Sequence, residues 1–92
     1  MKHAVETEEL FQQVLDETPQ AVKQQVDWSY DIADKIDARL HTLGMSQKEL
    51  ARRLGTSEAA VSKWVGGNHN FTLSTLARIS DALGEPIISI AR

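Results

Sequence analysis

The stretch QKELARRLGTSEAAVSKW, from Gln47 to Trp64, decides how this chain folds. Apolar residues recur at helical spacing on both sides of Gly55, which is the pattern of two short helices. Glycine adopts the left-handed conformation needed at a helix C-terminus, so the first helix is expected to stop at Gly55. We therefore predict a corner of three or four residues between two helices.

Capping signals bound both helices of this stretch. Ser46 and Glu49 spell a capping box, in which the serine hydroxyl accepts from the Glu49 backbone N–H and the Glu49 side chain reaches back to the N–H of Ser46. Ser57 can cap the second helix, which is expected to end at Gly66. Residues facing inward should seal the angle between the helices, with a small residue where they cross. These residues are Leu50, Ala51, Leu54, Val61, Trp64 and Val65.

Two further helical patterns precede the corner. Apolar residues at helical spacing follow an acidic run and predict an amphipathic helix over residues 7–17. Thr18 followed by Pro19 is a capping residue and a first-turn proline, so a second helix is expected to begin there. Its apolar pattern continues to Gly44, either as one long helix or as two separated near Trp28.

The C-terminal quarter carries one more helix and a different pattern. We expect a helix over residues 73–83, closed by Gly84. Pro86 bars its continuation, and the β-branched residues 87–90 predict a short strand. That strand is expected either to close the core of its own subunit or to pair across a dimer.

The composition excludes several classes of protein. A chain of 92 residues without cysteine has room for one small core and no disulfide or thiolate metal site to hold it. Its three histidines lack metal-ligand spacing and no nucleophile has a matching base, so we expect no metal, no cofactor and no enzyme activity. With no signal-type N-terminus and no apolar run near the roughly 18 residues of a membrane span, we expect a soluble cytoplasmic protein.

The net charge of −3 hides two regions of opposite sign. Between Met1 and Met45 there are four basic and nine acidic residues, a net charge of −5. From Ser46 to Arg92 there are six basic and four acidic residues, a net charge of +2. Electrostatic expectations therefore have to be made for each surface separately.

Two helices joined by a glycine-containing turn form the helix-turn-helix unit, whose second helix enters the major groove of DNA. At about 100° per residue, four residues of that helix fall opposite its buried face. They are Glu58, Ala59, Ser62 and Lys63. Lys63 can donate to guanine, whereas Glu58 either accepts from cytosine or only complements the helix dipole. Arg52 and Arg53 either approach phosphate or pair with Glu49.

The run SQKELARRLGTSEAAVSKW, followed by a polar loop and LSTLARISDALG, resembles the helix-turn-helix domain of the Cro/C1 repressor type, also called the XRE family. The resemblance covers about residues 34–84. It implies a five-helix domain that binds operator DNA as a two-fold dimer. We accordingly expect an all-α protein with an acidic helical arm over residues 1–30, the DNA-binding domain over residues 31–84, and a strand and tail over residues 85–92.

The resemblance also assigns DNA-contacting positions. Gln47 would touch a phosphate from the start of the first motif helix, and the loop around Asn68 and Asn70 would lie along the sugar-phosphate edge. The full set is Gln47, Ser57, Glu58, Ala59, Ser62, Lys63, Asn68 and Asn70. One departure concerns a buried arginine–glutamate pair common in the family, whose positions match Leu40 and Val65. Because both ends are apolar here, we expect these two side chains to lie in or near contact.

The acidic arm supports a second resemblance, to antitoxins of the HigA type, which repress their own operon and neutralise a basic RNA-cleaving toxin. The residues that would contact such a partner are Glu8, Glu9, Leu10, Phe11 and Val14. We therefore expect a dimeric repressor that reads a palindromic operator in double-stranded DNA and serves as the antitoxin of a type II toxin-antitoxin system. The alternatives are a stand-alone regulator without a toxin and a protein-interaction module without a role at DNA.

Overall fold

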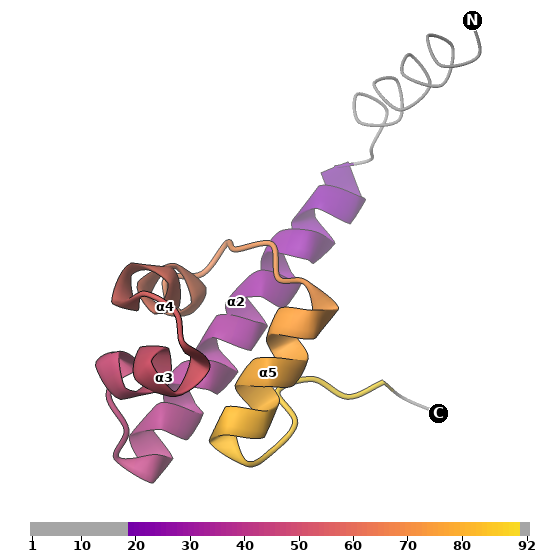
Figure 1. Ribbon diagram of the computed structural model, residues 1–92. Coiled ribbons are helices and arrows are strands. Elements are labelled where there is room, and N and C mark those ends of the chain that lie inside the picture. Colours follow the sequence, from indigo (N-terminus) through magenta and orange to yellow (C-terminus); the bar gives the residue numbers. More distant parts are fainter. Residues whose placement is uncertain (1–18, 91–92) are drawn as a thin grey trace, which may run out of the picture.

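A computed structural model describes residues 19–90 of the chain and shows four helices in that range. They are α2 (Pro19–Leu43), α3 (Gln47–Leu54), α4 (Glu58–Val65) and α5 (Leu73–Leu83). The three short helices gather against one part of α2, and the N-terminal end of α2 projects beyond them (Figure 1). None of these four helices is long and apolar enough to cross a membrane. The helix predicted over residues 7–17 and its neighbour Thr18 lie outside the described residues.

α2 runs from Pro19 to Leu43 as one unbroken helix rather than two. The polar residue Ser29 interrupts its apolar pattern without breaking it. The Ser29 hydroxyl lies 2.9 Å from the Gln25 carbonyl oxygen one turn earlier, which is one of two carbonyl oxygens within its reach, so the buried side chain has a hydrogen-bond partner. The boundary expected between residues 30 and 31 therefore falls within a continuous helix.

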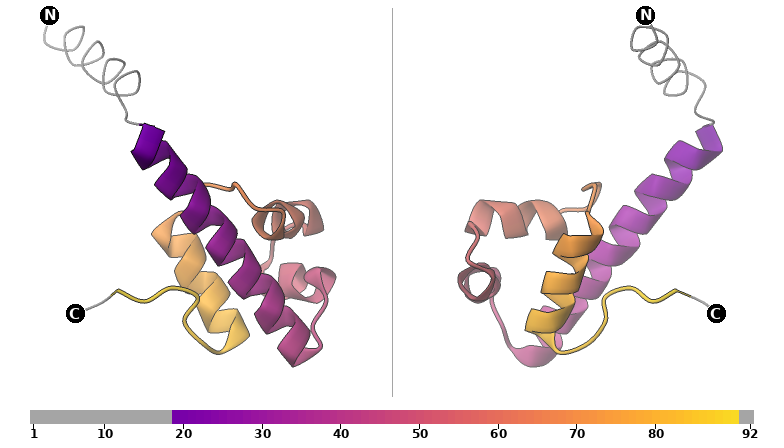
Figure 2. Two further views of the ribbon diagram at one scale, coloured as in Figure 1. Left: turned by 180° about the vertical axis from the view of Figure 1, so that it is seen from behind. Right: turned by 45° about the vertical axis from the view of Figure 1, so that its right-hand side comes forward.

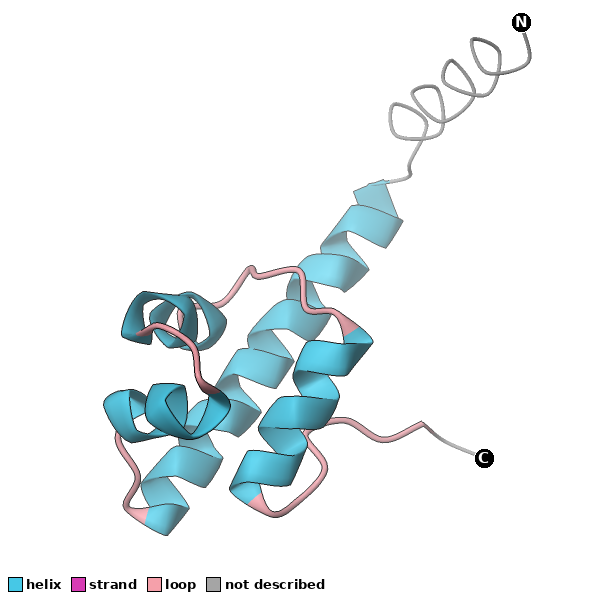
Figure 3. Ribbon diagram, in the orientation of Figure 1, coloured by secondary structure: helices cyan, strands magenta, loops and turns pink. Residues whose placement is uncertain are grey.

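The prediction of five helices followed by a C-terminal strand is wrong for the described part of the chain, which has four helices and no strand (Figure 3). α5 ends at Leu83 with Gly84 as its cap, and Pro86, which has no N–H to donate, cannot continue that helix. The N–H of Ile87 donates to Ser80 Oγ at 2.9 Å, and the Ile87 side chain is buried. A strand requires a second strand beside it, and residues 19–90 supply none.

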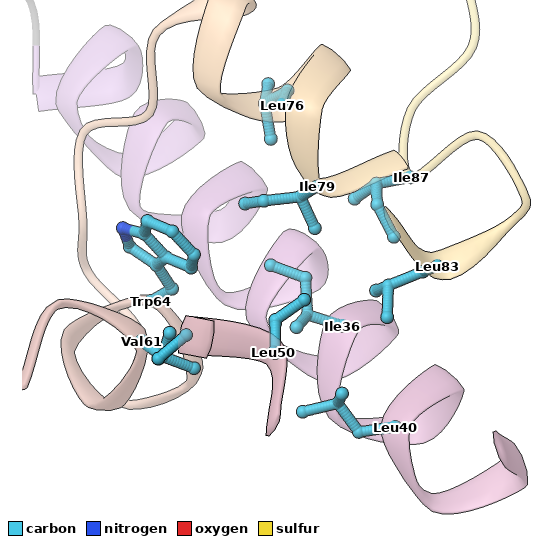
Figure 4. Packing of buried hydrophobic residues seen from close by; sticks show 10 residues of the cluster. Ile36, Leu40, Leu50, Val61, Trp64, Leu76, Ile79, Leu83 and Ile87 are labelled. Atoms are coloured by element: carbon cyan, nitrogen blue, oxygen red, sulfur yellow. The ribbon is translucent and has the colours of Figure 1, made fainter. Parts of the chain in front are cut away.

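A single apolar core lies where the four helices meet (Figure 4). Ile36 from α2, Leu50 from α3 and Ile79 from α5 are completely inaccessible to solvent. The rest of the cluster surrounds them: Leu40, Ala51, Val61, Trp64, Leu76, Leu83 and Ile87. The core therefore joins both helices of the predicted corner to α2 and α5.

Leu40 and Val65, the two apolar positions that depart from the family's ion pair, belong to this same region. Leu40 is buried within the core. Val65 is half-buried and packs against the core cluster. No unpaired charge is left at either position, which is the condition under which an apolar replacement is tolerated. Direct contact between the two side chains stays a prediction.

Truncation of Leu50 tests how far α3 depends on the shared core. Leu50→Ala is expected to lower the free energy of unfolding by about 2–5 kcal/mol, because the substitution opens a cavity at a fully buried site. Leu43→Ala is the matched control, since Leu43 is 42% exposed, and it should cost about 1 kcal/mol. Urea unfolding at one protein concentration measures both. Equal losses for the two variants would contradict the core described here.

Candidate nucleic-acid interface

The corner between α3 and α4 is formed by three residues, Gly55, Thr56 and Ser57. Gly55 has φ 64° and ψ 34°, the left-handed conformation predicted for it. Its N–H donates to the Arg52 carbonyl at 3.2 Å, and the Thr56 N–H donates to the Ala51 carbonyl at 3.0 Å. A Cβ at Gly55 would meet no atom within 4 Å, so glycine is needed here for its backbone angles rather than for space.

The start of α3 forms only half of the predicted capping box. Ser46 Oγ accepts from the Glu49 N–H at 3.0 Å, as expected. The Glu49 carboxylate does not return to Ser46, because it is taken by Arg52 at 2.6 Å and by Arg53 at 3.0 Å. Of the two alternatives for these arginines, pairing with Glu49 is the one observed.

This cluster shifts the ionisation of Glu49. Hydrogen bonds from Arg52, and then from Arg53, lower the pKa of the Glu49 carboxyl from 4.5 to about 2. The same carboxylate raises the pKa of Arg52. At neutral pH the outer face of α3 therefore carries two guanidinium groups that are partly neutralised by one carboxylate.

α4 presents the face that helical periodicity predicted. Ser57 caps it, its hydroxyl accepting from the Ala60 N–H at 3.1 Å. Val61 and Trp64 are buried in the core. The opposite side is exposed over all five predicted positions, which are Ser57, Glu58, Ala59, Ser62 and Lys63. The result is an outward surface of two serines, an alanine, a glutamate and a lysine.

A hydrogen bond joins this surface to the first residue of α3. The Ser62 hydroxyl donates to Gln47 Oε1 at 3.0 Å across the corner. The amide N–H groups of Gln47 have no partner within residues 19–90, so they remain able to donate to an external oxygen. This hydrogen bond could not be predicted from the sequence, because the two residues are fifteen positions apart and meet only at the observed angle between the helices.

The loop that follows α4 carries Asn68 and Asn70, both exposed. Asn68 has φ 53°, a left-handed conformation that asparagine tolerates better than most residues. Within the loop, the rings of His69 and Phe71 pack edge to face with centroids 4.7 Å apart. The two asparagines therefore stand on a segment with internal packing of its own.

α2 anchors this loop through two neighbouring residues that the sequence did not single out as part of the site. The Ser29 hydroxyl lies 2.9 Å from the His69 carbonyl oxygen, within reach of a hydrogen bond. The ring of Tyr30 lies so close to Gly67 that a Cβ there would overlap it, and Gly67 also has φ 86°. The loop is thus held to α2 at Gly67 and His69, and at Gly67 there is no space for a side chain.

Arginines of α5 and α2 form hydrogen bonds with the C-terminal ends of α3 and α5, respectively. Arg78 of α5 donates to the carbonyl oxygen of Leu54, the last residue of α3. Arg39 of α2 donates to the Leu83 carbonyl at 2.9 Å and lies 3.8 Å from Glu85. These bonds satisfy carbonyl groups that have no partner at a helix C-terminus. Because Arg78 and Arg39 are engaged in these bonds, fewer cationic side chains are available to bind DNA than the number of basic residues in the sequence suggests.

The geometry of the corner agrees with the comparison with known families. A family model described as helix-turn-helix matches residues 36–90. The chain belongs to this family. Membership of this Cro/C1-type helix-turn-helix family, also called XRE, indicates a DNA-binding regulator, with DNA as its partner. No curated protein and no solved structure matches the chain significantly.

The predicted DNA-contacting residues of this helix-turn-helix protein all lie within the described range. The corner brings Gln47 and the exposed side of α4 together, while Asn68 and Asn70 stand on the loop that follows α4. The residues expected to bind a partner protein, Glu8, Glu9, Leu10, Phe11 and Val14, lie outside the described residues.

The lowered pKa of Glu49 predicts a pH-dependent contribution to stability. Its pKa is depressed in the folded state, so its stabilisation is present above about 4.5 and is lost as the pH falls through about 2. Glu49→Gln should therefore lower the melting temperature at neutral pH, and the difference from wild type should shrink between pH 4.5 and 2. Asp37→Asn, which removes an exposed carboxylate of α2, is the control. A difference that does not change with pH would contradict the ion pairs described here.

Proposed function

We propose that this helix-turn-helix protein is a sequence-specific transcriptional repressor that binds a palindromic operator as a dimer and catalyses no reaction. The exposed polar side of α4 is the observation that carries the proposal, because the opposite side of the same helix is locked in the core by Val61 and Trp64. A helix held in this way can enter a groove without rearranging the domain.

The chemistry of the α4 surface suits the edges of base pairs. Lys63 can donate to O6 and N7 of guanine, Ser62 can donate or accept, and the Ala59 methyl can contact the methyl group of thymine. Glu58 can accept from the amino group of cytosine. Since these side chains are short, apart from Lys63 and Glu58, the helix backbone can lie close to the bases.

Neutral groups near α4 would bind phosphate and fix the position of the helix. Gln47 has free amide N–H groups, and Asn68 and Asn70 are exposed on the loop after α4. Amides bind phosphate oxygens without a net positive charge. An overall charge of −3 is therefore compatible with DNA binding, provided that the acidic part of the chain faces away from the duplex. Two copies of α4 about 34 Å apart would read two half-sites.

Replacement of Lys63 tests the proposed reading surface. Lys63→Ala should weaken binding to the DNA upstream of the protein's own gene by about 10- to 100-fold per half-site, the usual value of a specific base contact. Lys23→Ala is the matched control, because Lys23 is an exposed lysine of α2 paired with Asp27 and should have little effect. A gel shift with labelled duplex measures both.

Salt dependence completes this test. With about six phosphates contacted per dimer, affinity should fall on the order of 10³-fold between 50 and 200 mM salt. A flat salt response, or equal loss in the Lys63 and Lys23 variants, would count against the proposed surface. If wild type shifts no duplex at any salt concentration, the chain is instead a protein-interaction module without a role at DNA.

We further propose that the chain is the antitoxin of a type II toxin-antitoxin pair and that its acidic half binds a basic RNA-cleaving toxin. The first 45 residues carry a net charge of −5. Within the described part, two exposed aspartates, Asp34 and Asp37, lie one helical turn apart on the outer side of α2. Such a surface attracts a basic protein and repels DNA, so the two partners would use different faces.

Co-purification tests the antitoxin proposal. The full chain, co-expressed with the product of a short basic gene beside its own, should purify as a complex and suppress that product's RNA cleavage. Phe11→Asp should reduce recovery of the complex at least about tenfold, because a buried phenylalanine typically contributes more than 1.4 kcal/mol. Val22→Asp, at an exposed apolar position of α2, is the control. Operator binding without any such partner would indicate a stand-alone regulator.

A further inference from the structure

An apolar groove of about 660 Å³ lies on the domain apart from the proposed reading surface. Three parts of the chain border it: the middle of α2, the start of α5 with the loop before it, and the segment from Ile87 to Ile90. Ile32, Phe71 and Leu76 contribute to its lining. The groove is therefore built from segments that are far apart in the sequence.

Exposed apolar side chains gather at this groove. Trp28 is 60% exposed, Leu73 is 73% exposed and Ile90 is 80% exposed, and all three border it together with Ile88. Within residues 19–90, only three other large apolar side chains are exposed to a similar degree, and they lie elsewhere. A concentration of exposed apolar surface of this kind marks an interaction site.

The same surface contains both a hollow and a part able to fill it. Ile90 is exposed on the C-terminal segment, and residues 19–90 leave unfilled the groove that Trp28 and Leu73 border. A two-fold contact uses one surface twice, so that surface must be complementary to itself, as a projection and a recess on one surface can be. The groove meets this condition by itself.

The backbone of the C-terminal segment is also unpaired. Among residues 19–90, the N–H and C=O groups of Ile88, Ser89 and Ile90 have no hydrogen-bond partner. The segment leaves the helices with no strand beside it in the described chain (Figure 2). β-Branched residues with open backbone groups favour pairing with another extended segment. Two such segments related by a two-fold axis would pair antiparallel.

Charge at the groove favours a second copy of the chain over a basic partner. Asp31 and Lys35 border it one helical turn apart, and no ion pair within the described chain engages either of them. In a two-fold arrangement each copy would bring one Asp31 and one Lys35 to the contact, so neither sign of charge would be in excess there. A strongly basic toxin or a phosphate backbone would meet one favourable and one unfavourable charge.

We propose that this groove is the dimerisation surface: Ile88–Ile90 of each copy pair with each other, and each Ile90 enters the groove of the other copy between Trp28 and Leu73. The inference rests on the proposed dimeric repressor and identifies its interface. The groove also borders His69 and Asn70 of the loop proposed to contact phosphate. Dimerisation would therefore set the distance between the two DNA-contacting loops.

Sedimentation equilibrium of the full chain, with and without Ile90→Asp, tests this interface. Wild type should be a dimer, and Ile90→Asp should raise the dissociation constant about 100-fold or more. The substitution occurs twice per dimer, and loss of each buried isoleucine typically costs at least tenfold. Val22→Asp is the matched control, since Val22 is exposed but lies outside the groove, and it should stay dimeric. Far-ultraviolet circular dichroism should show that both variants keep the helical content of wild type.

A second readout follows Trp28, because Trp64 is already buried in the core. Acrylamide quenching of tryptophan emission should weaken as wild type dimerises and should not weaken for Ile90→Asp. A monomeric wild type, or a dimer that Ile90→Asp leaves intact, would overturn the inference. A monomeric wild type whose Trp28 is already shielded would show that another segment of the same chain fills the groove.

Gel shift with operator DNA separates this inference from the proposed function. If Ile90→Asp abolishes the dimer and weakens operator binding while the exposed side of α4 is unaltered, both are supported. If wild type dimerises through the groove but shifts no duplex, the repressor proposal fails and the interface remains. If wild type shifts the duplex and Ile90→Asp does so equally as a dimer, the interface is wrong and the repressor proposal remains.

Discussion

The left-handed backbone of Gly55 is the constraint on which the rest of the structure depends, because it turns the chain between α3 and α4 within three residues. A corner that short leaves the two helices one relative orientation, which Leu50 and Val61 hold by being completely buried in the same core. Once this angle is set, helical periodicity alone decides which residues of α4 face outward. The exposed side of α4 is thus the consequence of a backbone conformation and a packed core, and its own side chains contribute little to maintaining it.

A second set of contacts holds the surroundings of α4 in place. Ser29 and Tyr30 of α2 fasten the loop after α4, and Arg78 of α5 fastens the end of α3. Glu49 holds two arginines on α3, so the positive charge available near α4 is small and local. An acidic protein of this family can therefore offer DNA a compatible surface only where the corner presents it. Low positive charge elsewhere would reduce non-specific binding, because that binding is mainly electrostatic.

Local patterns in the sequence predicted the fold where local physics decides it. The caps at Ser46 and Ser57, the corner at Gly55 and the burial of Trp64 all depend on residues a few positions apart, and the structure confirms each. The prediction of a fifth helix rested on the family resemblance, and the prediction of a strand rested on the β-branched residues 87–90. Both are wrong within residues 19–90, because the Ile87 N–H is bonded to the Ser80 side chain instead of a helical carbonyl and the lone segment has no strand to pair with. Bonds such as that between Gln47 and Ser62 were not predictable, since they depend on the packing of segments distant in sequence.

Nuclear magnetic resonance titration of the isotope-labelled full chain with operator duplex tests the central claim most directly, because it locates the contact residue by residue. If the corner presents α4 to DNA, backbone amide signals of Ala59, Ser62 and Lys63, together with those of the loop around Asn68, should shift as duplex is added. Signals of core residues such as Ile79 should stay nearly unchanged, since a rigid corner binds without repacking. Shifts confined to the outer side of α2, or large shifts throughout the core, would contradict the account.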